Sequence, residues 1–238
     1  MRGTPITLES DGNVYTHAGE EIAIAATKSF LSQLIAVFAL GLHLGSVRRA
    51  LTAEETRGWM RALMDLPQQV ETALQCDDAC RRLAEQWKQM DDFIFLGRDI
   101  SYPIALEGAL KVKETSYIHA EGFPTGELPH GPTALIDEHL PVIVIDTVAA
   151  GDPESERRHQ KTYSLLQQIR DQGAHLFVVA NADKDYPGME VLRVPSLPAL
   201  LSPIVEIVPL QLLAYHLAVL RGVDVDRPRN LTKSVTKE

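Results

Sequence analysis

Residues 110–132 combine side chains that can move protons with a backbone that can hold them in place. The stretch reads LKVKETSYIHAEGFPTGELPHGP and contains two lysines, three glutamates and two histidines. Lys111 and Glu114 stand three residues apart in a predicted helix and so share a face, whereas His130 follows a segment rich in glycine and proline. On spacing alone a surface ion pair is the commoner interpretation of the first two. A carboxylate, an amine and an imidazole would also suit proton transfer on a small polar metabolite.

The composition excludes several other classes of protein. The chain has 238 residues, is 45% hydrophobic and carries a formal net charge of −9 without a basic stripe, so we expect no nucleic-acid partner. The longest apolar stretch, 30–44, is interrupted by polar residues and is shorter than a bilayer span, and the N-terminus lacks the apolar core of a secretory signal. We therefore expect no membrane partner, and a cytoplasmic location is expected because we interpret the two cysteines, Cys76 and Cys80, as reduced thiols.

No cofactor or metal is expected from the motifs. Cys76 and Cys80 form an isolated C-x3-C pair, which is weak evidence for zinc, and we interpret them as reduced thiols. Neither a G-x-G-x-x-G nor a G-x-x-x-x-G-K-[ST] motif is present, so nucleotide binding has no motif support.

The elements that must position these residues alternate between strands and helices. Short runs that are apolar on both faces predict a parallel sheet covered by helices, that is, a three-layer α/β fold. The expected strands are 92–98, 141–146, 174–181 and 191–194, and the helices between and after them are 102–118, 155–172 and 203–220. Ligands of such sheets bind beyond the carboxyl ends of the strands, so we expect a site at the turn after Leu96 and the loop after Ile118. Earlier helices are predicted at 27–44, at 53–76 with Thr52 as N-cap, and at 77–90.

Three separated stretches resemble the isomerase half of the glucosamine-6-phosphate synthase family, the glutamine–fructose-6-phosphate aminotransferases. They are AGEEIAIAATKSFLSQL at 18–34, YPIALEGALKVKETSYIHAEGFPTGELPHGP at 102–132 and PRNLTKSVTKE at 228–238. The similarity extends over essentially the whole chain. It implies the sugar isomerase (SIS) fold and conversion of fructose 6-phosphate to glucosamine 6-phosphate with ammonia from glutamine.

The resemblance also implies a domain organisation. The family's isomerase unit has two SIS lobes, so residues 1–45 are expected to be the last strand and helix of the first lobe. Residues 46–90 would be connecting helices, 91–222 the second lobe and 223–238 an irregular tail over the active site. The rest of the first lobe and the glutaminase domain would be missing, so the chain is expected to be incomplete on its own. Self-association is expected through the apolar side chains Phe30, Leu34, Phe38 and Leu42, which would lack part of their partner surface.

Roles for individual residues follow from the same resemblance. Glu114 matches the base that moves a proton between C1 and C2 of the sugar, and Lys233 matches the lysine that forms a Schiff base with the ketose. Lys111 matches a lysine close to the substrate. His130 matches the histidine that assists ring opening in the neighbouring subunit's site, which implies a homodimer.

Three positions depart from the family's pattern. The segment Ile24-Ala25-Ala26, matched to a substrate-binding segment, has Ala26 where a serine is common, so any contact with the sugar there must come from the backbone. Asp99 replaces a glycine in the turn after the first strand, and Pro129 replaces a lysine before the histidine.

Two other functions remain open from the sequence. One is a non-catalytic SIS module for dimerisation or sugar-phosphate binding, although such a module needs none of Glu114, His130 and Lys233. The other is a fructosamine-type deglycase, against which the C-terminal stretch PRNLTKSVTKE argues.

Overall fold

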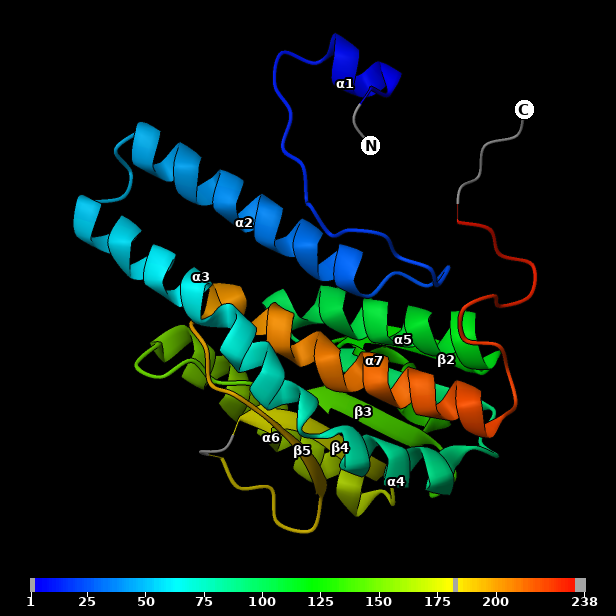
Figure 1. Cartoon of the computed structure of the whole chain (residues 1–238). Coiled ribbons are helices and arrows are strands. Elements are labelled where there is room, and N and C mark those ends of the chain that lie inside the picture. Colours follow the sequence, from blue (N-terminus) through cyan, green and yellow to red (C-terminus); the bar gives the residue numbers. More distant parts are fainter. Residues whose placement is uncertain (1–2, 182–183, 234–238) are drawn as a thin grey trace.

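A five-stranded parallel sheet forms the centre of the protein. The structure is a computed structural model that describes residues 3–181 and 184–233 (Figure 1). Its strands are β1 (Asp92–Gly97), β2 (His119–Pro124), β3 (Pro141–Ile145), β4 (His175–Asn181) and β5 (Glu190–Val194), in the order β2-β1-β3-β4-β5. All four pairings are parallel. The parallel sheet and four of its strands confirm the fold expected from the sequence.

Helices cover both faces of this sheet (Figure 1). The helices α4 (Asp77–Trp87), α5 (Tyr102–Ser116) and α7 (Ser202–Leu220) pack on one face, where Trp87 lies edge-on against Phe93 and Phe177. Helix α6 (Pro153–Asp171) covers the opposite face. Successive strand residues point to opposite faces, so the uninterrupted apolar runs supply both cores.

The strand β2 was not expected from the sequence. Its segment His119–Pro124 alternates polar and small residues, and His119 and Glu121 are exposed because β2 is an edge strand. Pairing with β1 in register, Asp92 opposite His119, is what makes it a strand. The preceding helix α5 ends at Ser116 because Tyr117 adopts a left-handed conformation with φ of 58°.

Helices α2 (Lys28–Val47) and α3 (Ala53–Leu74) precede the sheet. Thr52 is confirmed as the N-cap of α3, in a capping box with Glu55. The strand expected within residues 1–45 is absent from the described segment 3–27, which holds the short helix α1 (Pro5–Glu9) and irregular chain. A strand requires a neighbour to hydrogen-bond with, and this segment lies apart from the five-stranded sheet (Figure 1).

The apolar face of α2 that was expected to lack part of its partner surface is partly covered. Phe30, Leu34 and Phe38 pack against the main core and Leu42 is buried. The exposed stripe is a different one, made of Val37, Leu40, Leu44 and Val47 at positions i, i+3, i+7 and i+10. The helix is apolar around most of its circumference, which is why the sequence pattern did not reveal which side would pack.

Two helical segments, Lys28–Val47 and Ala199–Leu220, have the length and apolar composition of a membrane span. The second is mostly buried and is the core helix α7 with the turn before it. Length and composition alone are weak evidence for a membrane, since core helices pass the same test.

Candidate active site

Lys111 joins two carboxylates on helix α5. Its Nζ lies 2.6 Å from Glu114 Oε2 and 3.3 Å from Glu107 Oε1. The lysine side chain is only 4% exposed, whereas Glu114 is 22% exposed. The positions i, i+4 and i+7 place the three charged groups along one face of the helix. This is an enclosed ion-pair network rather than the surface pair that spacing alone favoured.

The cluster does not lie beyond the carboxyl ends of the strands, where the sheet topology led us to expect a site. Glu114 belongs to the last turn of α5, and α5 is the crossover that returns the chain from the end of β1 to the start of β2. A crossover helix runs antiparallel to its strands, so its last turn lies near their amino ends. Of the two places expected, the turn after Leu96 lies at the opposite end of the strands, whereas the segment after Ile118 begins beside Glu114 and lines the same pocket.

The C-terminal tail comes back to the loop that precedes α2 (Figure 1). Lys233 Nζ lies 2.9 Å from Glu21 Oε2 and donates a hydrogen bond of 2.5 Å to the carbonyl of Ala23, 210 residues earlier in the chain. The Ile24 N–H donates to the carbonyl of Asp226 over 3.0 Å. These contacts bring Lys233 beside the Ile24-Ala25-Ala26 segment.

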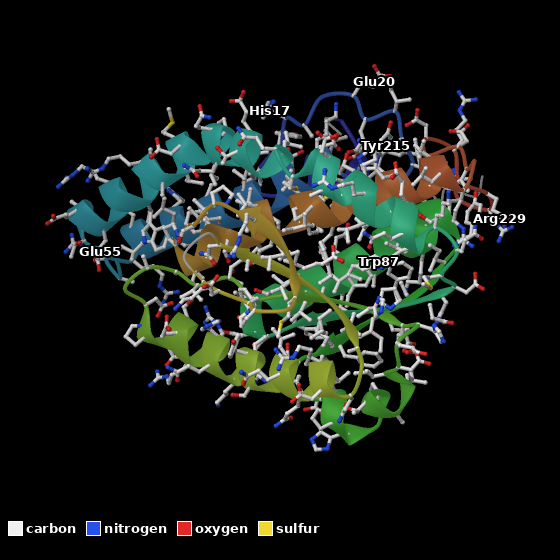
Figure 2. The ribbon with its side chains drawn as sticks, turned by 90° about the horizontal axis from the view of Figure 1, so that it is seen from below. His17, Glu20, Glu55, Trp87, Tyr215 and Arg229 are labelled. Atoms are coloured by element: carbon white, nitrogen blue, oxygen red, sulfur yellow. The ribbon has the colours of Figure 1, made fainter. Side chains whose placement is uncertain are left out.

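Tyr117 ties the same tail to the end of α5. Its hydroxyl accepts a hydrogen bond of 2.7 Å from the Arg229 N–H, and the Arg229 guanidinium lies 4.1 Å from the centre of its ring. Arg229 is at the periphery of the molecule (Figure 2). Between the tail and α5 lies a cavity of about 440 Å³, lined by Glu114, Tyr117 and residues 229–231 among others. The tail thus forms one wall of a cavity whose other wall carries the candidate base.

His130 is not brought into this cluster. It is exposed in the short 3-10 helix Leu128–His130 after β2, and within the described residues no hydrogen bond or ion pair joins it to Glu114 or Lys111. Pro129 stands in the first turn of that helix, where proline needs no backbone hydrogen bond. The substitution of Pro129 is therefore compatible with the local fold.

The turn after β1 retains the geometry of a glycine-rich turn in spite of Asp99. Asp99 has a φ of 55°, in the left-handed region that aspartate tolerates better than most residues. Its carboxylate lies 3.1 Å from Arg158 on α6. Gly97 cannot be replaced there, because a Cβ would lie 2.3 Å from the Ser101 carbonyl oxygen. The turn thus accommodates aspartate in the left-handed region, with its carboxylate in an ion pair to Arg158.

The carboxyl ends of β1 and β3 carry a separate polar cluster. Glu206 of α7 is fully buried and accepts hydrogen bonds from the hydroxyls of Ser101 and Thr147. Burial raises the pKa of this carboxyl group despite those hydrogen bonds. The group is sealed from solvent and lies at the opposite end of the strands from Glu114.

Two residues of the site were missed from the sequence. Glu107 is one helical turn before Lys111, and that spacing could have suggested it. Glu21 had no local signal, because its partner Lys233 is distant in the chain.

Taken together, the fold and the candidate site define a class: a parallel α/β domain in which the end of a covering helix and the C-terminal tail line a common pocket. Residues 88–221 match the SIS domain family, and the chain belongs to that family. This confirms the SIS-type fold that the sequence resemblance implied.

The similar proteins of known name agree with one another. The whole chain is 45% identical to 39% of the glutamine–fructose-6-phosphate aminotransferase [isomerizing] of Thermus thermophilus. The Bordetella pertussis enzyme of the same name is 47% identical, over 94% of this chain and 36% of that protein. The chain thus spans well under half the length of these relatives.

The solved structures that are similar include one of these aminotransferases. The C-terminal domain of the glucosamine-fructose-6-phosphate aminotransferase of Francisella tularensis superposes with a TM-score of 0.88 and 35% identity, over 95% of this chain and 63% of that one. The glucosamine-6-phosphate deaminase of Thermotoga maritima is more distant, with a TM-score of 0.61 and 26% identity over 91% and 59% of the chains. The chain is therefore similar to the C-terminal, isomerase part of the aminotransferases.

Proposed function

We propose that this chain is the sugar-isomerase part of an enzyme that converts fructose 6-phosphate and glutamine-derived ammonia to glucosamine 6-phosphate. The observation that carries the proposal is the cavity that Glu114 at the end of α5 lines together with tail residues 229–231, from which the tail continues to Lys233 beside the loop before α2. The similarity to the aminotransferases over the whole chain supports the same reaction. The remaining part of the enzyme would be a glutaminase domain and most of a first SIS lobe, to which residues 1–45 belong.

The residues take roles that suit an enediol path. Lys233 in its neutral form adds to the C2 carbonyl of the ketose, and loss of water leaves an imine. Ammonia then adds to C2 and the Lys233 amine leaves, so that C2 carries the imine of ammonia, which makes the C1 proton more acidic. Glu114 as carboxylate takes that proton from C1 and returns it to C2, a transfer that needs no metal. Lys111 keeps the carboxylate oriented and neutralises charge near the sugar phosphate. The backbone of Ile24, Ala25 and Ala26 contacts the sugar.

Dimerisation is part of the proposal. His130 is exposed and lies outside its own protomer's cluster, which suits a histidine that assists ring opening in the neighbouring subunit's site. A homodimer in the cytoplasm is the corresponding assembly and location.

The test uses a fusion that joins this chain to the preceding part of the Thermus relative and measures glucose 6-phosphate formation from fructose 6-phosphate. Glu114→Gln keeps the shape and removes the proton acceptor, so turnover is expected to fall by about 10²–10⁴-fold. In Lys233→Arg the borohydride-trapped adduct with fructose 6-phosphate is expected to disappear, because a guanidinium is not a nucleophile.

Glu121→Gln is the matched control, because Glu121 is an exposed carboxylate on the neighbouring strand. Normal turnover by Glu114→Gln would refute the catalytic role. Release of free amino acid from a fructosamine 6-phosphate, without activity on fructose 6-phosphate, would instead favour a deglycase. Fructose 6-phosphate binding without either reaction would favour a sugar-phosphate-binding module.

A further inference from the structure

Glu21 performs the N-terminal capping of helix α2. Its Oε1 accepts hydrogen bonds from the backbone N–H groups of Thr27 at 3.0 Å and Ser29 at 3.2 Å, and its Oε2 accepts one from the Ser29 hydroxyl. Thr27, the residue at the N-cap position, makes no capping hydrogen bond with its own side chain. A carboxylate eight residues before Ser29 thus satisfies one of the free N–H groups of the first turn, that of Ser29, and the N–H of the N-cap residue.

The same carboxylate also holds the candidate nucleophile. Its Oε2 lies 2.9 Å from Lys233 Nζ, and the Glu21 side chain is 9% exposed whereas that of Lys233 is 46% exposed. The lysine's second acceptor, the Ala23 carbonyl, belongs to the same loop. The ammonium is therefore held by two acceptors from one short segment.

The charge state of Glu21 suits both contacts. Partial burial raises its pKa, but the hydrogen bonds from Ser29, Thr27 and Lys233 outweigh burial and lower the pKa to about 2. The group is consequently a carboxylate at neutral pH.

We propose that Glu21 is a positioning residue for Lys233, which couples the N-terminus of α2 to the C-terminal tail and holds the lysine amine beside Ile24-Ala25-Ala26. The inference rests on the proposed function, in which Lys233 is the amine that attacks the sugar carbonyl. In the resting state both acceptors occupy the amine, so Lys233 must lose a proton and leave Glu21 before it can attack. Glu21 thus determines the resting position of the Lys233 amine. The ion pair between the two residues must break before the amine can react.

The test measures the reactivity of Lys233 in the 238-residue chain by reductive methylation at low reagent concentration, followed by peptide mass spectrometry. Glu21→Gln keeps a hydrogen-bond acceptor and removes the charge, so labelling of Lys233 is expected to rise about two- to fivefold, the range of an exposed ion pair. Added salt is expected to raise labelling in the wild type and to have little effect in Glu21→Gln, because only the charged pair is screened.

Two controls separate positioning from capping. Glu20→Gln changes the neighbouring exposed carboxylate, which points to solvent (Figure 2), and is expected to leave Lys233 labelling unchanged. Ser29→Ala removes the hydroxyl hydrogen bond that helps to hold Glu21 at the N-terminus of α2 while leaving the pair with Lys233, and is also expected to leave Lys233 labelling unchanged. Exposed Lys161 on α6 is the internal reference in every sample.

Equal labelling of Lys233 in the wild type and Glu21→Gln would overturn the inference, and so would an equal rise in Ser29→Ala. The labelling uses no sugar, so it is independent of the proposed reaction. A shift in labelling without any trapped fructose 6-phosphate adduct would leave Glu21 as the residue that holds Lys233 and would refute only the catalytic function.

Discussion

Lys111 is the most enclosed charged group of the candidate site, and its energetic role is separable from its chemical one. Two carboxylates within 3.3 Å compensate the loss of water around its ammonium. Removing one member of a buried ion pair leaves uncompensated charge, and this usually costs more than the pair itself contributes. Here it would leave Glu107 and Glu114 facing each other without a cation.

Lys111→Met, which keeps most of the side-chain volume, is therefore expected to lower the free energy of unfolding by about 3 kcal/mol, the lower end of the usual range because Glu114 retains access to water. Urea denaturation followed by circular dichroism measures this. Lys113→Met on the exposed side of α5 is the matched control and should change stability by less than about 0.5 kcal/mol. Equal changes in the free energy of unfolding for the two substitutions would mean that the ion-pair network around Lys111 does not contribute to stability.

The lowered pKa of Glu21 predicts how the free energy of unfolding depends on pH. Its pKa falls from 4.5 in the unfolded chain to about 2 in the folded one. A carboxyl group with a lowered pKa stabilises the folded state above pH 4.5, and this stabilisation is lost as the pH falls toward 2. The difference in unfolding free energy between the wild type and Glu21→Gln should therefore be constant above pH 4.5 and shrink below it. Thermal melts from pH 2 upward to neutral pH measure it, and a pH-independent difference would contradict the ionised capping role.

At the scale of elements, the site depends on how the tail is attached to α5. Tyr117 is placed for this by the left-handed turn that ends the helix, and it holds Arg229 through both its hydroxyl and its ring. The tail has no regular secondary structure between Val223 and Lys233, so these local contacts replace the hydrogen bonds that a helix or strand would supply.

Tyr117→Phe removes the hydrogen bond but keeps the ring, and Tyr117→Leu removes both. Trypsin cleavage after Arg229 is expected to accelerate about fivefold in Tyr117→Phe, which corresponds to the loss of one hydrogen bond, and further in Tyr117→Leu. Tyr215→Phe, on an exposed tyrosine of α7, should have no effect. Identical cleavage rates in Tyr117→Phe and Tyr117→Leu would show that the ring contact with Arg229 contributes nothing.

At the scale of the whole molecule, α2 carries a stripe of exposed large apolar side chains along one side. Val37 is 70% exposed and Val47 64%, and Leu40 and Leu44 complete the stripe. A continuous apolar stripe on a helix is a surface on which two protein molecules can associate. The helix is attached to the body by its opposite side, so the stripe is free to make such contacts.

The chain is therefore expected to self-associate with increasing concentration, as measured by sedimentation velocity. The double substitution Leu40→Glu and Leu44→Glu should abolish that dependence without changing the circular dichroism spectrum. Ile6→Glu changes an equally exposed apolar side chain outside the stripe and should leave the concentration dependence in place. Unchanged association in the double variant would place the contact elsewhere on the molecule.

The sequence by itself determined the parallel α/β fold and most of its elements, because apolar runs, helical spacing and the Thr52 cap depend on neighbours a few residues apart. The same local spacing placed Lys111 and Glu114 on one helix face, and the resemblance added Lys233 and His130. Recognition of the SIS family followed from the same motifs.

Only the tertiary structure decided how these parts meet. Strand β2 exists because β1 offers it hydrogen-bonding partners, and the position of Glu114 near the amino ends of the strands follows from the direction of the crossover helix. Two faces of α2 are similarly apolar, so only the packing of the folded chain decided which of them contacts the core. The Glu21–Lys233 pair joins residues from opposite ends of the chain, and no local pattern encodes it, because an ion pair requires only that the folded backbone bring two charges within a few ångströms.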